Sequence, residues 1–91
     1  MLTLTENAGT VVSDLVARAS EVDTAGLRIQ QGADRFDVAI ADAPAPSEVV
    51  VEQAGARVFM DAPVARVLEE MTLDAVVTPE GEIRFALAPQ R

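Results

Sequence analysis

The chain has no cysteine and no histidine, and it also lacks lysine, tryptophan and tyrosine. Without cysteine there is no disulfide, no thiolate nucleophile, no zinc finger and no cysteine-held iron–sulfur cluster. Without histidine the commonest metal ligand and the commonest general base are missing. These absences exclude most familiar kinds of active site, so the residue types present do not point to a chemical activity.

The charge balance is strongly acidic. The chain contains fifteen acidic residues and seven arginines, which gives a net charge of −8. We interpret this surplus as a solvated surface that keeps a small protein in solution, and an acidic docking face for a basic partner is the alternative. Nucleic acid is excluded as a partner, because binding to it needs clustered Lys/Arg and stacking aromatics. The aromatic residues Phe36, Phe59 and Phe85 sit in strand-like patterns and are expected in the core.

A length of 91 residues fits a single domain over residues 1–91, and an apolar fraction of 49% favours a folded chain. No apolar run approaches the roughly 20 residues that span a bilayer, so no membrane association is expected. Residues 1–6 lack the basic and apolar regions of a secretory signal. We therefore expect a cytoplasmic protein.

The first periodic segment predicts an amphipathic helix near the N-terminus. Its apolar residues recur with helical spacing at Ala8, Val11, Val12, Leu15, Val16 and Ala19. Thr5 suits the N-cap, because its hydroxyl can accept from an orphan backbone N–H, and Glu6 suits the positive end of the helix dipole. Leu2 and Leu4 alternate with Thr3, which indicates a short strand before the helix.

After Gly26 the apolar period changes to two, and three hairpins are predicted. The first runs from 27 to 41, the second from 48 to 60 with its turn at 53–55, and the third from 73 to 87 with its turn at 78–81. A short helix capped by Asp61 precedes the last hairpin. The order predicts an α+β fold, with an N-terminal amphipathic helix and mostly antiparallel hairpins in two small packed sheets.

Several segments, taken in order, resemble the HesB/IscA-like family, the A-type carriers of iron–sulfur cluster assembly. Residues 2–8 resemble the family's opening, 25–29 its Gly-Leu-Arg strand, and 50–61 its Val-x-Glu-x-x-Gly hairpin. Residues 73–76 resemble the segment after the short helix, and 85–89 the last strand. The resemblance implies a HesB-like domain over almost the whole chain.

The ligands that the resemblance implies are missing. Family carriers hold a cluster or iron with three cysteines, one in a loop after the Gly-Leu-Arg strand and two in a C-terminal Cys-Gly-Cys motif. Here the loop reads Gln31-Gly32-Ala33-Asp34-Arg35-Phe36, and the chain stops at Arg91, soon after Pro89. No family site residue is therefore carried over, no cofactor is expected, and we interpret the chain as a degenerate, cysteine-free member.

Carboxylates are the remaining candidates for metal ligands. Asp34, Asp37 and Asp42 cluster around the degenerate loop and the strand after it, and oxygen ligands suit Mg²⁺, Ca²⁺ or Mn²⁺. Strand alternation places Asp37 toward solvent, and the spacing does not resemble a calcium loop, so a turn and a solvated strand face are the favoured interpretation. No catalytic residue is predicted, since the serines have neither histidine nor lysine to activate them.

The sequence thus predicts a non-enzymatic scaffold or interaction protein, related to iron–sulfur carriers but without cluster ligands. Two alternatives stay open, an oxygen-ligated iron or divalent-metal protein and a stand-alone domain of unknown role. The expected partner is a protein, either an iron–sulfur assembly protein or a second copy of this chain. An edge strand near residues 48–52 leaves a homodimer open.

Overall fold

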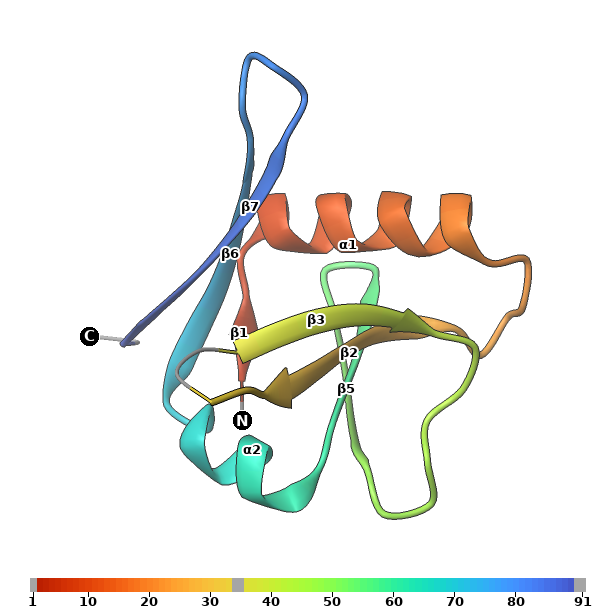
Figure 1. The fold of residues 1–91 in the computed structure, drawn as a ribbon, viewed down its shortest axis with the longest axis vertical. Coiled ribbons are helices and arrows are strands. Elements are labelled where there is room, and N and C mark those ends of the chain that lie inside the picture. Colours follow the sequence, from red (N-terminus) through yellow and green to blue (C-terminus); the bar gives the residue numbers. More distant parts are fainter. Residues whose placement is uncertain (1, 34–35, 90–91) are drawn as a thin grey trace.

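The structure, a computed structural model, describes residues 2–33 and 36–89 (Figure 1). Within these residues the chain forms two helices and seven strands. In chain order they are β1 (Thr3–Leu4), α1 (Glu6–Ala19), β2 (Gly26–Gln31), β3 (Phe36–Ala41), β4 (Val49–Gln53), β5 (Ala56–Met60), α2 (Ala62–Val67), β6 (Met71–Val77) and β7 (Ile83–Pro89). The predicted α+β class and the predicted order of elements are both confirmed.

The N-terminal helix begins where its cap predicts. The hydroxyl of Thr5 accepts from the backbone N–H of Ala8 at 3.0 Å, and the helix ends at Ala19. Ala8 and Val12 are buried, as the helical spacing predicts. Ala19 is exposed, so that part of the prediction was wrong.

The three predicted hairpins are present. Strand β2 pairs with β3, β4 with β5, and β6 with β7, each pair antiparallel. The β4–β5 turn has positive φ at both central residues, 51° at Ala54 and 80° at Gly55, which is the type I′ geometry of two-residue hairpins. Gly81, with φ 87°, closes the β6–β7 turn through an N–H donated to the carbonyl of Thr78.

The hairpins assemble into two sheets through parallel pairs. The smaller sheet has the order β1-β6-β7 and the larger the order β3-β2-β5-β4. Strands β1 and β6, and strands β2 and β5, run parallel. Figure 1 shows α1 crossing above the larger sheet and the β6–β7 hairpin rising beside it. The buried apolar residues that join these layers include Leu4, Val12, Leu27, Val58 and Leu73.

The side-chain amide of Gln53 links the two sheets. Its Oε1 accepts from the backbone N–H of Leu4 at 2.9 Å, and its Nε2 donates to the carbonyl of Leu2 at 2.8 Å. The amide therefore bonds to β1 as a peptide group of a neighbouring strand would, and it satisfies backbone groups of a half-buried strand. From the sequence, Gln53 was expected only as part of the turn at 53–55.

Neither helix, within residues 2–33 and 36–89, has the length and apolar composition that a membrane crossing demands.

Candidate functional site

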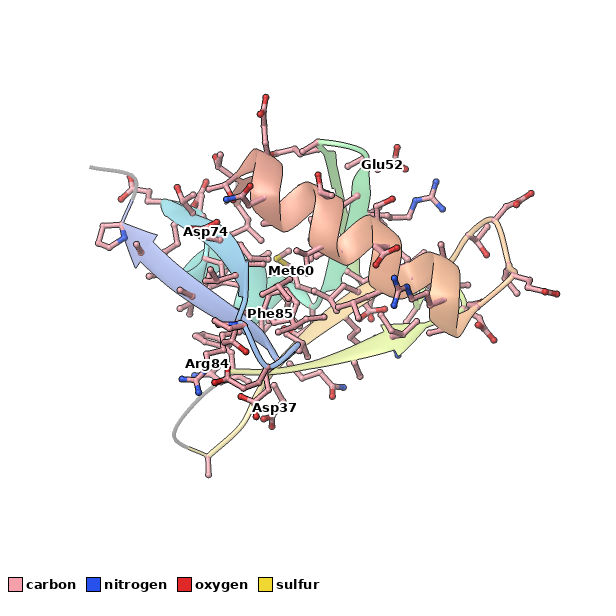
Figure 2. All side chains as sticks on the ribbon, turned by 90° about the horizontal axis from the view of Figure 1, so that it is seen from above. Asp37, Glu52, Met60, Asp74, Arg84 and Phe85 are labelled. Atoms are coloured by element: carbon pink, nitrogen blue, oxygen red, sulfur yellow. The ribbon has the colours of Figure 1, made fainter. Side chains whose placement is uncertain are left out.

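An apolar groove lies beside the loop in which the family resemblance places a ligand. Strands from both sheets contribute to it, and its volume is about 540 Å³. The lining residues are Ile29, Phe36, Asp37, Val38, Leu73, Phe85 and Leu87. Figure 2 labels Asp37, near the start of β3, and Phe85, on β7; both line the groove.

The groove lies between the two sheets, since its lining comes from β2 and β3 of the larger sheet and from β6 and β7 of the smaller one. Phe36 and Val38 share one face of β3, while Phe85 and Leu87 share the core-facing side of β7 opposite Ala75 and Leu73. Phe36 and Phe85 are only half-buried, so the expectation that all three phenylalanines are core residues holds fully for Phe59 alone. Strand alternation indicates which residues face inward, but not that a groove is left between the two sheets.

The chemistry of the groove is that of a binding surface. Six of its seven lining residues are apolar, and Asp37 supplies a carboxylate. Apolar surface of this kind favours contact with another apolar surface, since burial removes it from water.

The predicted carboxylate candidates do not come together. Asp34 lies outside the described residues. Asp37 is near the start of β3, and Asp42 follows its end, which places their Cα atoms about 16 Å apart along an extended strand. The carboxylate of Asp42 accepts from the hydroxyl of Ser20 at 2.8 Å. In the part of the chain that the structure describes, no three Asp or Glu side chains gather as a metal site would require.

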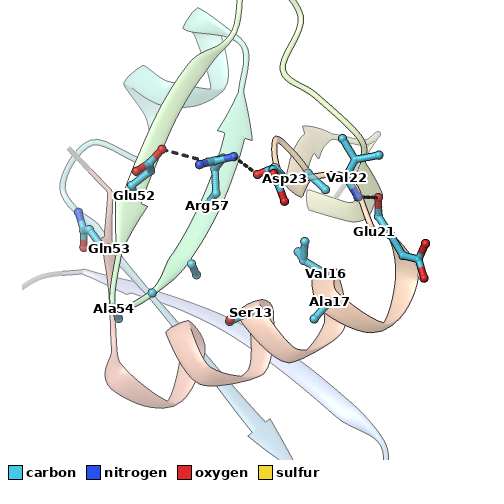
Figure 3. Close-up of a pocket in the computed structure, with 14 residues that line it drawn as sticks. Ser13, Val16, Ala17, Glu21, Val22, Asp23, Glu52, Gln53, Ala54 and Arg57 are labelled. Carbon is cyan, nitrogen blue, oxygen red and sulfur yellow. Dashed lines mark hydrogen bonds and ion pairs between the residues drawn. The ribbon is translucent and has the colours of Figure 1, made fainter.

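A second depression, of about 620 Å³, lies between α1 and the β4–β5 hairpin (Figure 3). Arg57, one of the residues that line this depression, brings a guanidinium group to it. That group contacts the carboxylate of Glu52 at 3.0 Å and donates to the carbonyl of Asp23 at 2.8 Å. Both contacts offset its charge and orient it toward residues of its own chain, so this depression does not present a prepared anion site.

The Arg28–Glu48 ion pair is the most tightly bonded charged contact in the described chain. Arg28 Nη2 lies 2.7 Å from Glu48 Oε1, and its Nε donates to Oε2 at 2.8 Å, a bidentate arrangement. Glu48 Oε1 also accepts from the backbone N–H of Ala45, and the Glu48 side chain is only 8% exposed. The hydrogen bond from Arg28 holds the pKa of Glu48 below its ordinary value, although burial opposes the shift.

We expect this pair to make part of the stability dependent on pH. Folding lowers the pKa of Glu48 from its ordinary value of 4.5. The ionised carboxylate therefore stabilises the folded protein fully above pH 4.5, and this stabilisation is lost as the pH falls through the lowered pKa. The free energy of unfolding of Glu48→Gln should therefore lie furthest below that of the wild type at neutral pH. The difference should shrink in acid, measured by urea unfolding with far-UV circular dichroism.

Glu82→Gln is the matched control for this prediction. Glu82 pairs with Arg84 at 3.5 Å, and both side chains are largely exposed, so the pair contributes little at any pH. If the free energies of unfolding of wild type and Glu48→Gln differed by the same amount from neutral to acidic pH, the pH dependence would not come from the Arg28–Glu48 pair.

The donor set does not fit an iron–sulfur cluster. Such clusters are held by cysteine thiolates, with histidine as the known substitute. The loop after β2 offers Gly32 and Ala33 at its described positions, and the 91-residue sequence contains neither cysteine nor histidine.

Comparison with known proteins gives one sequence relative and a clear structural likeness. No family model matches the chain. "Uncharacterized protein blr1755" of Bradyrhizobium diazoefficiens is 31% identical over 86 residues, covering 89% of this chain and 80% of that protein.

Two crystal structures share the fold. One is Escherichia coli SufA, described as involved in biosynthesis of iron–sulfur clusters. It is 20% identical with a TM-score of 0.82, over 98% of this chain and 85% of SufA. The other is IscA with a [2Fe–2S] cluster, 18% identical with a TM-score of 0.69 and the same coverage. The chain therefore belongs to the same family as blr1755, and it is a cysteine-free form of the HesB/IscA-like fold that SufA and IscA share.

Proposed function

We propose that this protein is a non-enzymatic interaction or scaffold protein that keeps the fold of iron–sulfur carriers and holds no cluster of its own. One observation carries the proposal: a fold matching SufA with a TM-score of 0.82 is built from 91 residues without cysteine or histidine. The scaffold is retained while the residue types that bind a cluster are absent.

The candidate site supports binding rather than catalysis. The groove between β3 and β7 is apolar except for Asp37. A general acid–base pair or an activated nucleophile needs two matched polar groups within hydrogen-bond reach. We therefore propose that the groove side of the molecule contacts a protein, and that this protein is either a component of iron–sulfur assembly or a second copy of the chain. The first possibility follows from the process in which SufA is involved.

Anaerobic reconstitution with iron and sulfide tests the proposal. We expect the purified protein to stay colourless, because no thiolate is available to hold a cluster. IscA, which carries a [2Fe–2S] cluster in its crystal structure, is the positive control under the same conditions. A stable brown species with the absorption spectrum of a cluster would overturn the proposal.

A calorimetric titration with Fe²⁺ addresses the oxygen-ligated alternative. A bound ion must stabilise the folded state, so the midpoint of thermal unfolding should rise with ion concentration if a site exists. We expect neither saturable heat nor a shifted midpoint. Saturable binding at one equivalent that Asp37→Asn removes would establish the carboxylate site instead.

A further inference from the structure

A second apolar groove, which we call the β4–α2 groove, lies between strand β4 and the short helix α2. Its volume is about 360 Å³. The lining residues are Leu2, Val49, Val51, Met60, Ala62, Ala65, Arg66 and Glu69. None of them lines the groove between β3 and β7, so the two surfaces are separate.

The deepest part of the β4–α2 groove belongs to the core. Leu2, Val51 and Met60 are at most 2% exposed, whereas Val49 and Ala62 are exposed at its rim. Six of the eight lining residues are apolar, so an apolar side chain that enters the groove removes apolar surface of both partners from water. The volume is at the low end of the roughly 300–1,000 Å³ of small-molecule pockets, which suits a short segment of a larger molecule.

Arg66 brings an unpaired positive charge to this apolar surface. The other four arginines within the described residues each form an ion pair with a carboxylate. Arg66 forms no ion pair with a residue that the structure describes, and Glu69, the second charged residue of the lining, is not free. A guanidinium matches a carboxylate with two parallel N–H groups. The groove therefore favours a ligand in which an apolar group is joined to a carboxylate.

Strand β4 is an edge of the larger sheet, and it adds backbone groups to the site. Among the described strands it pairs with β5 alone. In a two-residue hairpin the residues next to the turn exchange hydrogen bonds, and the bonding alternates along the strand. Val50 and Glu52 therefore direct their backbone N–H and C=O groups outward. An extended peptide can pair with these groups while alternate side chains enter the groove beside Val49 and Val51.

We propose that the β4–α2 groove binds the C-terminal end of a partner protein whose last residue is apolar. The peptide lies along β4 as an added strand, its last side chain enters the groove, and its terminal carboxylate pairs with Arg66. This inference goes beyond the proposed function, because it assigns a second surface and the chemistry of its ligand.

A chain terminus fits a small groove better than an acidic side chain does. The terminal carboxylate belongs to the same residue as the last apolar side chain. The neighbouring side chain of an extended peptide points to the opposite face, and the next one on the same face lies about 6.6 Å along the strand. Only the terminus therefore presents the apolar group and the carboxylate close together.

Charge selects both this edge of the sheet and the type of peptide. The groove beside the β3 edge carries a carboxylate, Asp37, whereas the β4–α2 groove carries the unpaired guanidinium of Arg66. A protein with a net charge of −8 repels strongly acidic peptides. A peptide whose terminal carboxylate is its single negative charge meets the least repulsion.

A nuclear magnetic resonance titration of the full chain with the peptide acetyl-Thr-Val-Thr-Val tests the proposal. We expect saturable shifts of the residues that line the β4–α2 groove, and slower hydrogen exchange of the outward N–H of Val50. The same peptide with a C-terminal amide should bind about tenfold more weakly, because it lacks the charge that Arg66 recognises.

Variants separate the charge from the groove. Arg66→Gln should weaken binding of the acid about tenfold, and amidation should then have little further effect, because both changes remove the same contact. Arg84→Gln is the matched control, since it removes one exposed arginine on β7 and should leave binding unchanged. Ala62→Leu, at an exposed position of the lining, narrows the groove and should weaken both peptides. Circular dichroism verifies that each variant folds.

Octanoate tests an aliphatic acid as the alternative occupant. It carries a carboxylate and an apolar chain without backbone groups, so it should bind more weakly than the peptide and leave the exchange of the Val50 N–H unchanged. Octanoate that binds as tightly as the peptide, equal binding of acid and amide, or Arg66→Gln that binds like the wild type would each overturn the proposal. The absence of saturable shifts at millimolar peptide would also overturn it. Cluster reconstitution is an independent readout, so failure of this proposal and failure of the proposed function are distinguishable.

Discussion

Replacing Gly9 with valine should destabilise the protein by about 3 kcal/mol or more, although glycine is a poor helix residue. Gly9 is buried in α1, and its Cα faces the β4–β5 turn. A Cβ built at Gly9 would overlap both the Cβ and the carbonyl oxygen of Ala54. Ala54 already has φ 51° in a tight turn, so moving its backbone away from the new side chain would cost further free energy. The larger side chain would push the helix off the hairpin.

Gly9→Ala gives a sharper test of the same contact, because two effects oppose one another. In an isolated helix the change would stabilise by about 1 kcal/mol. Here the methyl group meets backbone atoms of Ala54, and overpacking of this kind costs about 1–3 kcal/mol, so the net effect should be destabilising. Urea unfolding followed by circular dichroism measures it, since the chain has no tryptophan or tyrosine for fluorescence.

Ser13→Ala is the control for helix propensity. Ser13 is exposed on the same helix, so this change should be neutral or slightly stabilising. If Gly9→Ala stabilised the protein as much as an exposed substitution does, the close approach of α1 to the β4–β5 turn would be refuted.

The helices, their caps and the turns could be predicted from the sequence, because the residues that determine them are close together along the chain. The hydroxyl of Thr5 caps α1 through Ala8, three residues away, and Asp61 caps α2 through Val64 in the same manner. In each case the information lies in short spacing, alternation or turn chemistry.

Contacts between residues far apart in the sequence could not be predicted, because they depend on how the helices and strands pack together. Two side-chain hydrogen bonds of Gln53, to Leu4 and Leu2, join residues 49 and 51 positions apart, and the turn sequence does not indicate them. Gly9 lies in a regular helical pattern, and only the position of Ala54 explains the absence of a side chain. The groove likewise forms between two sheets, and the sequence does not specify how they pack. Alternation places Val38 on the face opposite Asp37, but it does not indicate that Val38 is 40% exposed.

Replacing Phe59 with alanine should be among the most damaging single substitutions in the chain, with an expected loss of about 3–5 kcal/mol. Phe59 is fully buried, but it faces the opposite side of the sheet from Val58 and Met60, which belong to the main cluster. Arg28, its partner across β2 and β5, shares that side. There the guanidinium of Arg28 holds the 43–48 segment through Glu48 and the carbonyl of Ala43.

The ring of Phe59 is enclosed too closely for the site to collapse without rearrangement. A Cβ at Gly26 would lie 2.8 Å from its Cζ and 2.7 Å from the carbonyl oxygen of Arg57, so the ring packs directly against the backbone of β2. Backbone on this side is held by two ladders of hydrogen bonds, and a cavity left by the ring would persist. A domain of this size has only about 5–10 kcal/mol of total stability, of which this loss is a large part.

Phe85→Ala is the matched control, because Phe85 is half-buried at the groove and gives up less apolar contact on truncation. Phe59→Leu, which keeps most of the volume, should fall between Phe59→Ala and the wild type. The free energies of unfolding should therefore increase in the order Phe59→Ala, Phe59→Leu, wild type, with Phe85→Ala above Phe59→Ala. If Phe85→Ala were instead the more damaging of the two alanine variants, Phe85 would contribute more to stability than Phe59. The groove between the sheets, and not the side of the sheet that Phe59 shares with Arg28, would then be the more important packing site.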